Sequence, residues 1–387
     1  MKDQLNKIFH KVFHSEEQLD YFFAPGRVNL IGEHTDYNGG LVFPCALDVG
    51  TYIAMAKRND DIIRLYSDNF PEKGIMEVAL SDLANKEEDD WANYPKGVIK
   101  IMKDHGYEGK TGFDAVFYGN IPNGAGLSSS ASIELVTAIL WDWLHGFQID
   151  RVEMVKMCQE VENKYIGVNS GIMDQFAIGM GKEDHAILLD CNTLDYEYAP
   201  IQLEGMKLVI ANTNKRRTLA DSKYNERRAE CEQALKDLQS VVSINHLCDL
   251  STEKFEEIKH AIKDPIALNR AKHAVTENER TKVAVEKLKE MDLDAFGQLM
   301  NQSHISLRDD YEVTGDHLDA LVEAAWEETD VLGSRMTGAG FGGCTVSLVK
   351  EVDLDGIVER IGKRYEEKTG ITPEFYIVGV GTGAKKV

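Results

Sequence analysis

A segment rich in glycine and serine, residues 119–134, carries the densest chemical signal in the sequence. Gly124 and Gly126 allow the backbone to approach a ligand closely, and serine hydroxyls follow between Ser128 and Ser132. An apolar pattern typical of a helix begins where the serines end. Because unpaired N–H groups and the positive end of the helix dipole gather at a helix start, the segment can bind an anion such as phosphate. A turn with an ordinary serine N-cap is the alternative.

A second polar cluster lies in residues 24–40, where short acidic, amide and basic side chains alternate with glycines. Its members are Arg27, Asn29, Glu33, His34, Asp36 and Asn38. Carboxylates accept hydrogen bonds from sugar hydroxyls in fixed directions, so such a loop can bind a hydroxyl-rich ligand. Apolar stretches at 21–23 and 41–43 bracket the cluster. A solvated loop with local salt bridges is the alternative.

Glu162 falls on the apolar face of the helix that the pattern predicts over 151–166. At about 100° per residue, it lies between Val155 and Cys158 on that face. A carboxylate that points inward needs a cation or strong hydrogen-bond donors. A metal ligand and a buried ion pair with an arginine both satisfy this requirement.

Asp174 is the one acid among small and apolar residues in the stretch 167–176. An aspartate among glycine, serine and asparagine is usually a turn former or a cap, so a catalytic role does not follow from this pattern alone. Tyr224, in the polar stretch 221–228, is equally compatible with an aromatic residue on a helix surface.

The segment 338–343 matches the pattern GxGxxG, but it leads into a strand-like stretch. A dinucleotide-binding fingerprint opens a helix instead, so this function is excluded. A loop whose backbone closely approaches another group and a plain tight turn both remain compatible with the spacing.

Strands and helices that could hold these residues intermix along the whole chain. β-branched and aromatic content predicts strands over 51–56, 113–118, 207–211, 345–349 and 375–380. Helical patterns cover 132–143, 151–166, 223–238 and 357–367. This mixture favours an α/β or α+β class. We expect a close-packed boundary near residue 200, which gives two domains, 1–200 and 201–387.

The 387 residues include 43 lysines and arginines and 65 aspartates and glutamates, a formal charge of −22. This balance argues against nucleic acid or an anionic membrane as the main partner. No apolar run reaches the ~18 residues that a membrane span needs, and residues 1–14 contain no apolar core of a secretory signal. The six cysteines are scattered without a CxxC motif, so we expect a cytoplasmic protein without a disulfide framework or a zinc site.

Three motifs together resemble a known family. Residues 26–37 resemble the galactokinase signature, and residues 124–132 are similar to the ATP-phosphate loop of the GHMP superfamily, the galactose, homoserine, mevalonate and phosphomevalonate kinases. Residues 336–343 resemble the third motif of that superfamily. The motifs occur in the family's order and span nearly the whole chain.

The resemblance implies a two-domain α+β fold like that of GHMP kinases, with the active site in the interdomain cleft. It also implies a galactokinase reaction, in which Mg²⁺ and ATP serve to phosphorylate α-D-galactose at its C1 hydroxyl. The products would be galactose 1-phosphate and ADP, in the first step of galactose catabolism. The partners implied are the small molecules galactose and ATP, and no nucleic acid, membrane or protein partner is implied.

The resemblance also implies roles for single residues. Asp174 would be the catalytic aspartate, paired with Arg27, and the Mg²⁺ ligands would be Ser130 and Glu162. The sugar contacts implied are Glu33, His34, Thr35, Asp36 and Tyr224. The ATP contacts implied are Ser67, Gly124, Ala125, Gly126, Leu127, Ser128, Ser129 and Ser130. Trp91 and Tyr94 resemble residues that border the nucleotide, but they could equally be core residues.

Two other functions remain open. The first is a related kinase, for instance one for N-acetylgalactosamine; mevalonate and homoserine fit less well, because Glu33, Asp36 and Asp174 would repel their carboxylates. The second is a non-catalytic sensor that binds galactose and ATP. The presence of Arg27 together with Ser130, Glu162 and Asp174 disfavours a sensor.

Overall fold

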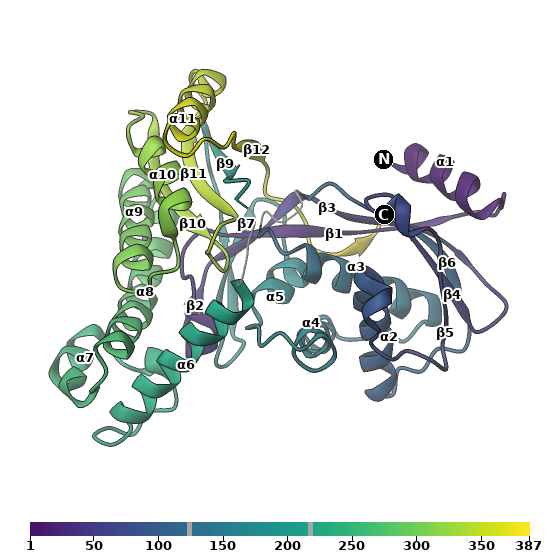
Figure 1. Cartoon of the computed structure of the whole chain (residues 1–387), viewed down its shortest axis with the longest axis horizontal. Coiled ribbons are helices and arrows are strands. Elements are labelled where there is room, and N and C mark those ends of the chain that lie inside the picture. The colour runs from purple at the N-terminus through teal and green to yellow at the C-terminus, as the bar shows by residue number, and fades with distance from the viewer. Residues whose placement is uncertain (122–125, 216–219) are drawn as a thin grey trace.

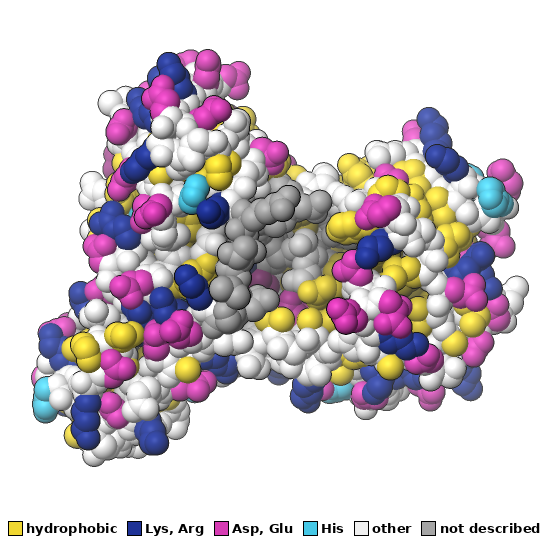
Figure 2. Space-filling model, in the orientation of Figure 1, with side chains coloured by type: hydrophobic (Ala, Val, Ile, Leu, Met, Phe, Trp, Pro, Cys, Tyr) yellow, Lys and Arg dark blue, Asp and Glu magenta, His cyan; other side chains and the backbone are white. Residues whose placement is uncertain are grey.

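The computed structural model describes residues 1–121, 126–215 and 220–387, with the backbone alone described at 220–222. Two lobes lie side by side in Figure 1, and the long strands β1 (Asp20–Asn29) and β3 (Pro44–Lys57) extend from one toward the other. Acidic and basic side chains are interspersed over both lobes in Figure 2. Among the described residues, no helix combines the length and the apolar character needed to cross a bilayer.

A six-stranded sheet, in the order β13-β1-β3-β6-β4-β5, forms the centre of one lobe. Its other strands are β4 (Ile62–Ser67), β5 (Met76–Ala79), β6 (Phe113–Gly119) and β13 (Lys385–Lys386). Helices cover one face: α2 (Asn93–Asp104), α3 (Ser129–His145), α4 (Arg151–Glu160) and α5 (Met173–Met180). Helix α1 (Lys2–Phe13) covers part of the other face.

Strand β3 is buried on both faces because helices cover both sides of the sheet there. Its side chains alternate between these two faces. Ile53 and Met55 pack into the core beneath α3, whereas Ala54 and Ala56 pack against Phe9 of α1. This arrangement explains why residues 53–56 are all apolar instead of alternating between apolar and polar.

The second lobe contains a four-stranded antiparallel sheet in the order β10-β11-β9-β12. The strands are β9 (Met206–Asn212), β10 (Val331–Thr337), β11 (Cys344–Lys350) and β12 (Glu374–Val378). Residues of α9 pack on one face, at Leu208 and Ile210, and residues of α10 and α11 pack on the other, at Val209 and Ala211. The helices are α6 (Ala220–Leu238), α7 (Thr252–Ile258), α8 (Pro265–Lys289), α9 (Leu293–Asp309), α10 (Gly315–Trp326) and α11 (Leu354–Thr369).

A small third sheet of β2 (Leu41–Val42), β7 (His185–Asp190) and β8 (Tyr196–Pro200) follows the polar loop after β1. Short 3₁₀ turns lie at Asp36–Asn38, Pro71–Lys73, Glu87–Ala92, Leu247–Asp249 and Lys259–Ala261. The segment Val161–Ile166 is a π-helical continuation of α4.

Every strand and helix expected from the sequence is present, in a mixed α+β architecture. Two expectations need correction: β12 ends at Val378, so the strand predicted to residue 380 was too long, and the helix predicted over 151–166 changes from α to π at Val161. The last strand, β13, returns to pair with β1, with Lys386 opposite Phe22. The domain boundary near residue 200 stays a prediction.

Candidate active site

A cavity of about 790 Å³ is lined by residues from all three motifs. The polar loop after β1 contributes acidic residues, α3 and the π-helical turn contribute Ser130 and Glu162, and α5 contributes Asp174. From the C-terminal half, α6 contributes Tyr224 and the loop after β10 contributes Gly338 and Ala339. The cavity therefore lies where the two halves of the chain meet, as expected for an interdomain site.

Arg27 and Asp174, 147 residues apart, form a two-pronged ion pair in this cavity. Arg27 Nε lies 2.8 Å from Asp174 Oδ1, and Nη2 lies 2.9 Å from Oδ2. The arginine side chain is 4% exposed and the aspartate 27%. Burial lowers the pKa of Arg27, but the charges of Asp174, Glu33 and Asp36 outweigh burial and raise it. The pair thus presents a carboxylate to the cavity with its counter-ion fixed behind it.

The described end of the glycine-serine loop is anchored to β1. Arg27 donates its backbone N–H to the Leu127 carbonyl at 3.1 Å and Nη1 to the Gly126 carbonyl at 2.8 Å. The Leu127 side chain is buried in the core. Gly124 and Ala125, two of the predicted ATP contacts, lie outside the described residues. The third motif approaches the same carbonyl, since a Cβ at Gly338 would lie 3.0 Å from Gly126 O. The segment 338–343 is therefore a close-approach loop.

The serines at the start of α3 have different partners. Ser128 has a left-handed backbone (φ 61°) and makes no side-chain cap; its hydroxyl donates instead to Asp174 Oδ2. Ser132 donates to the Ala24 carbonyl at 2.8 Å and joins the helix to β1. Ser129 is exposed, and Ser130 lines the cavity. The ordinary N-cap alternative is therefore wrong for Ser128.

Glu162 is buried, and its partners are hydroxyl and amide groups. The Ser170 hydroxyl donates to Oε2 at 2.5 Å, and Ser130 and Gln175 also contact the carboxylate. Burial raises the pKa of Glu162, the Ser170 bond offsets part of this increase, and the charge of Asp174 adds to it. In the described parts of the chain, Glu162 forms no ion pair with an arginine, which was the alternative.

The donors around Glu162 suit a hard cation. The two predicted ligands are the Ser130 hydroxyl oxygen and the Glu162 carboxylate, which contact each other. Among the described residues, no group of three or more His, Cys, Asp or Glu side chains could hold a metal by itself. Magnesium fits such a set, because it binds through one or two carboxylates plus phosphate oxygens and water.

Glu33 and His34 are both buried, and both side chains have hydrogen-bond partners within the protein. Glu33 Oε1 accepts hydrogen bonds from the Gly338 N–H at 2.8 Å and the Thr337 hydroxyl at 3.1 Å, with Arg335 at 3.4 Å. His34 Nδ1 lies 2.7 Å from the Tyr37 hydroxyl. Burial, together with the nearby His273, lowers the pKa of His34 to about 3, so its imidazole is neutral.

Asp36 and Tyr224 complete the predicted sugar side. Burial and the charge of Asp174 raise the pKa of Asp36 to about 7. A Cβ at Gly171 would lie 1.7 Å from Asp36 Oδ2, so a larger residue there would force the carboxylate to shift. The Tyr224 ring lies 5.7 Å from that of His34. Acidic, aromatic and imidazole groups therefore surround one end of the cavity.

Six predicted contacts among the described residues do not line this cavity: Thr35, Ser67, Gly126, Leu127, Ser128 and Ser129. The Thr35 hydroxyl is 2.7 Å from the Leu41 carbonyl and 2.9 Å from the Gly32 carbonyl, inside its own loop. Ser67, at the end of β4, is buried and accepts from the Asn69 N–H at 3.3 Å. Trp91 packs on the Phe117 ring in the core at 5.3 Å. Ligand contacts for Thr35, Ser67 and Trp91 stay predictions.

The chain matches three models of known families. A galactokinase galactose-binding signature covers residues 7–57, a GHMP kinase N-terminal domain 93–182, and a GHMP kinase C-terminal domain 284–367. A galactokinase from Fusobacterium nucleatum is 61% identical over 100% of both chains. One from Clostridium acetobutylicum is 59% identical over 100% of this chain and 99% of its own.

The chain belongs to the galactokinase family. A solved structure of Lactococcus lactis galactokinase, complexed with galactose, is similar with a TM-score of 0.98 and 47% identity, covering 100% of both chains. Membership confirms the resemblance, the GHMP-kinase fold and the class of ATP-dependent sugar kinases that the motifs predicted.

Several residues that support the galactokinase signature were not predicted from the sequence. Three of them lie on α8: Glu277 accepts from the Gly32 N–H at 3.0 Å, Asn278 accepts from the Leu41 N–H at 2.9 Å, and His273 contacts the Glu33 carbonyl at 3.1 Å. His273 and Glu277 are four residues apart, which is the spacing of one helical face, and Asn278 follows directly. Nothing in the sequence indicates which loop this face contacts.

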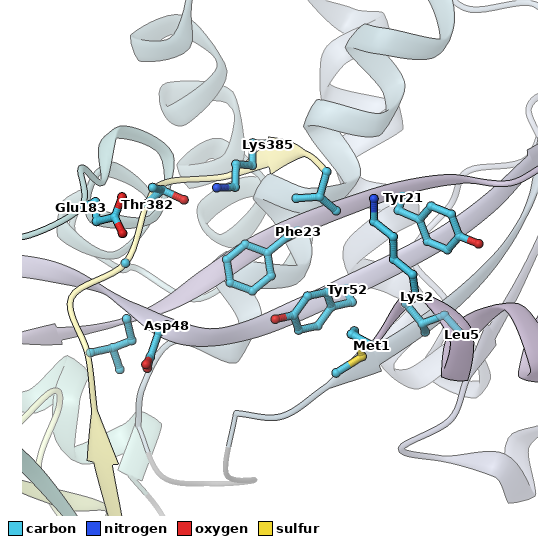
Figure 3. Close-up of a pocket in the computed structure, with 13 residues that line it drawn as sticks. Met1, Lys2, Leu5, Tyr21, Phe23, Asp48, Tyr52, Glu183, Thr382 and Lys385 are labelled. Carbon is cyan, nitrogen blue, oxygen red and sulfur yellow. The ribbon is translucent and has the colours of Figure 1, made fainter.

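A second cavity, of about 390 Å³, lies at the two chain ends and contains no predicted site residue. Figure 3 shows Phe23 and Tyr52 at its centre, with Lys385 from the C-terminal segment above them and Lys2 from α1 beside Tyr21. Because none of the residues that the three motifs supply lines it, this cavity is not the kinase site that the motifs define.

Proposed function

We propose that this protein transfers the γ-phosphoryl group of ATP to the C1 hydroxyl of α-D-galactose and releases galactose 1-phosphate and ADP. The observation that supports this most strongly is the Arg27–Asp174 pair. It brings a residue of the galactokinase signature and a residue of α5 together next to Ser128, at the start of α3. A carboxylate with an arginine behind it is suited to hold a hydroxyl next to a phosphoryl group.

Galactose would lie at the acidic end of the cavity. Glu33, Asp36 and Asp174 would accept hydrogen bonds from its hydroxyls, with the neutral His34 and the hydroxyl of Tyr224 as further partners. The burial of Glu33 and His34 favours recognition, because a sugar that lacked a hydroxyl beside them would leave a buried polar group unpaired. Thr35 would act by shaping the loop.

The triphosphate would lie at the start of α3. Backbone N–H groups and the helix dipole favour anions there, and the loop from Gly124 to Ser130 would wrap the phosphates, with Ser67 toward the nucleoside. Ser130 and Glu162 would hold Mg²⁺. When bound, Mg²⁺ neutralises phosphate charge and orients the phosphate oxygens for transfer.

Asp174 would accept the proton of the C1 hydroxyl. Its Oδ2 already accepts from Arg27 Nη2 and from the Ser128 hydroxyl, whereas Oδ1 accepts from Arg27 Nε alone among the described hydrogen-bond donors. Each carboxylate oxygen has two lone-pair positions, so Oδ1 retains one for the sugar. Arg27 fixes the orientation of the carboxylate and would offset charge on the phosphoryl group. The loose transition state allows the proton to move late.

We infer a cytoplasmic location, where ATP is available. Buried thiols such as Cys45, Cys158 and Cys231 fit a reducing compartment.

A coupled assay of ADP release tests the proposal with galactose, N-acetylgalactosamine, mevalonate and homoserine in the presence of Mg²⁺ and ATP. We expect galactose to give the highest kcat/KM by at least about tenfold, a difference of ~1.4 kcal/mol in transition-state binding. A higher value for N-acetylgalactosamine would assign the related kinase instead. Binding of galactose and ATP without galactose 1-phosphate would assign a sensor.

A further inference from the structure

The short loop 167–171 contacts three parts of the site through three successive residues. The Asn169 carbonyl accepts a hydrogen bond from Arg228 Nη1 at 2.9 Å, and the Ser170 hydroxyl donates to Glu162 Oε2 at 2.5 Å. Gly171 lies against the carboxylate of Asp36. The loop joins the π-helical turn to α5, the helix that carries Asp174.

On the metal side, the loop is fixed to Glu162 by both backbone and side chain. The N–H groups of Gly167 and Val168 donate to the Glu162 carbonyl at 2.8 and 2.9 Å. The Ser170 hydroxyl then orients the carboxylate itself. A shift of this loop would therefore move the carboxylate that is proposed to hold Mg²⁺.

On the sugar side, the loop lies directly against the carboxylate of Asp36. A Cβ on Gly171 would lie 1.7 Å from Asp36 Oδ2 and 2.4 Å from its Cγ, so the glycine backbone is in contact with the carboxylate. A movement of the Asp36 carboxylate toward the loop would press on Gly171, and Ser170 is its direct neighbour.

Arg228 reaches this loop from the opposite half of the protein. It lies on α6, one turn after Tyr224, and its guanidinium is 5.9 Å from the ring centre of Tyr37. Nε pairs with Glu232 at 3.3 Å, which leaves Nη1 directed at the Asn169 carbonyl. The helix that carries one sugar contact is thus tied to the loop that orients the metal ligand.

We propose that Arg228 and Ser170 are positioning residues that couple the binding of galactose to the binding of Mg²⁺ and ATP. This inference rests on the proposed function. Galactose orders Asp36 and Tyr224, and both are linked to the loop, so Glu162 becomes ordered before the nucleotide arrives. Ordering that one ligand has already produced lowers the entropy cost for the second, and the effect is reciprocal.

Isothermal titration calorimetry of the full chain tests the coupling. Galactose is titrated with and without saturating Mg²⁺ and a non-hydrolysable ATP analogue, and the analogue is titrated with and without galactose. We expect each ligand to raise the affinity of the other by the same factor, at least about fivefold. A factor within about twofold of one in the parent protein would overturn the inference. Failure of galactose to bind at all would instead overturn the proposed function.

Variants assign the coupling to residues. Arg228→Ala should lower the factor to within about twofold of one, whereas Arg228→Lys, whose ammonium can donate to the Asn169 carbonyl, should retain part of it. Ser170→Ala removes the hydroxyl that donates to Glu162 and should also reduce the factor. An unchanged factor in both alanine variants would overturn the inference.

Arg308→Ala is the matched control. Arg308 is 33% exposed and pairs with Asp309 on α9, while Arg228 is 35% exposed. The control should keep the factor of the parent protein. An equal loss in Arg308→Ala would attribute the effect to general destabilisation and overturn the specific role of Arg228.

Discussion

The cavity between the lobes and the cavity at the chain ends both contain acidic and basic side chains, but in different surroundings. In the first, Arg27 is 4% exposed and its charge is matched by Asp174 at 2.8 Å. In the second, Lys2, Asp48, Glu183 and Lys385 are exposed, and none forms an ion pair with the described residues. Figure 3 shows their charged ends spread around an aromatic floor.

This difference decides which cavity can carry out chemistry. A charge held in a buried, fixed position acts through a low dielectric and needs little reorganisation during a reaction. Exposed charges are screened by water and salt, so their effect on a ligand is small. The presence of charged and aromatic residues around a cavity is therefore a weaker sign of an active site than their burial and hydrogen bonding.

Asp174→Asn should produce the largest loss. The amide keeps the shape and one acceptor oxygen but cannot take a proton, so kcat should fall by about 10²–10⁴-fold, while the Kd for galactose changes by less than roughly tenfold. Steady-state kinetics and calorimetry measure the two quantities. Turnover near that of the parent protein would remove Asp174 from the role of base.

Glu162→Gln should produce the next largest effect, on the Mg²⁺ requirement. Loss of the buried negative charge should raise the Mg²⁺ concentration for half-maximal activity by at least about tenfold. Glu153→Gln, on the same helix, is the control, because Glu153 accepts from the exposed Tyr107 hydroxyl at 2.8 Å. If both variants needed equal Mg²⁺, Glu162 would have no special part in metal binding.

Asp36→Asn should have a smaller effect that depends on pH. The pKa of Asp36 rises from 3.8 to about 7 on folding, so the folded state binds more protons than the unfolded state between these values. Stability of the ligand-free protein should therefore fall as pH rises through this window. The asparagine variant lacks this loss. The Tm of the variant minus the Tm of the parent should therefore be larger at pH 8 than at pH 5, by more than about 2 °C.

Thermal unfolding of both proteins without ligand at the two pH values measures this difference. The low pKa of His34 acts in the opposite direction below pH 6.5, but it is common to both proteins. An equal Tm difference at pH 5 and pH 8 would contradict a raised pKa at Asp36.

Lys385→Ala should have the smallest effect of all. Its side chain is exposed at the terminal cavity and lacks an ion-pair partner among the described residues, so kcat/KM for galactose should remain within about twofold and stability within ~0.5 kcal/mol. A loss comparable to that of Glu162→Gln would show that the terminal cavity influences the kinase site, and the contrast between the two cavities would fail.

Sequence patterns predicted the regular elements where one periodicity dominates. Strands β6, β9 and β11 and helices α3 and α11 follow this rule. Helix α8 was missed because polar residues interrupt its apolar inward face: Arg270, His273, Glu277, Asn278 and Thr281 are buried among the apolar residues of that face. His273, Glu277 and Asn278 bond to the signature loop and its flank, so the apolar repeat that marks a helix is interrupted.

The candidate site was predicted in composition but not in orientation. Residue type alone does not distinguish Ser130, which lines the cavity, from Ser132, which bonds to the Ala24 carbonyl; only the family resemblance pointed to Ser130. The resemblance also implied a sugar contact for Thr35, whose hydroxyl bonds to carbonyls of its own loop; that contact stays a prediction.

The sequence by itself determined the kinds of chemistry that are available, since hydroxyls, carboxylates and glycines occur in three ordered motifs whatever the fold. The tertiary structure decided which of these groups meet and in what state. Arg27 and Asp174 come together only because β1 and α5 pack in one lobe. Burial, which no local pattern specifies, neutralises His34 and raises the pKa of Asp36, because removing a charge from water has a cost that depends on everything packed around it.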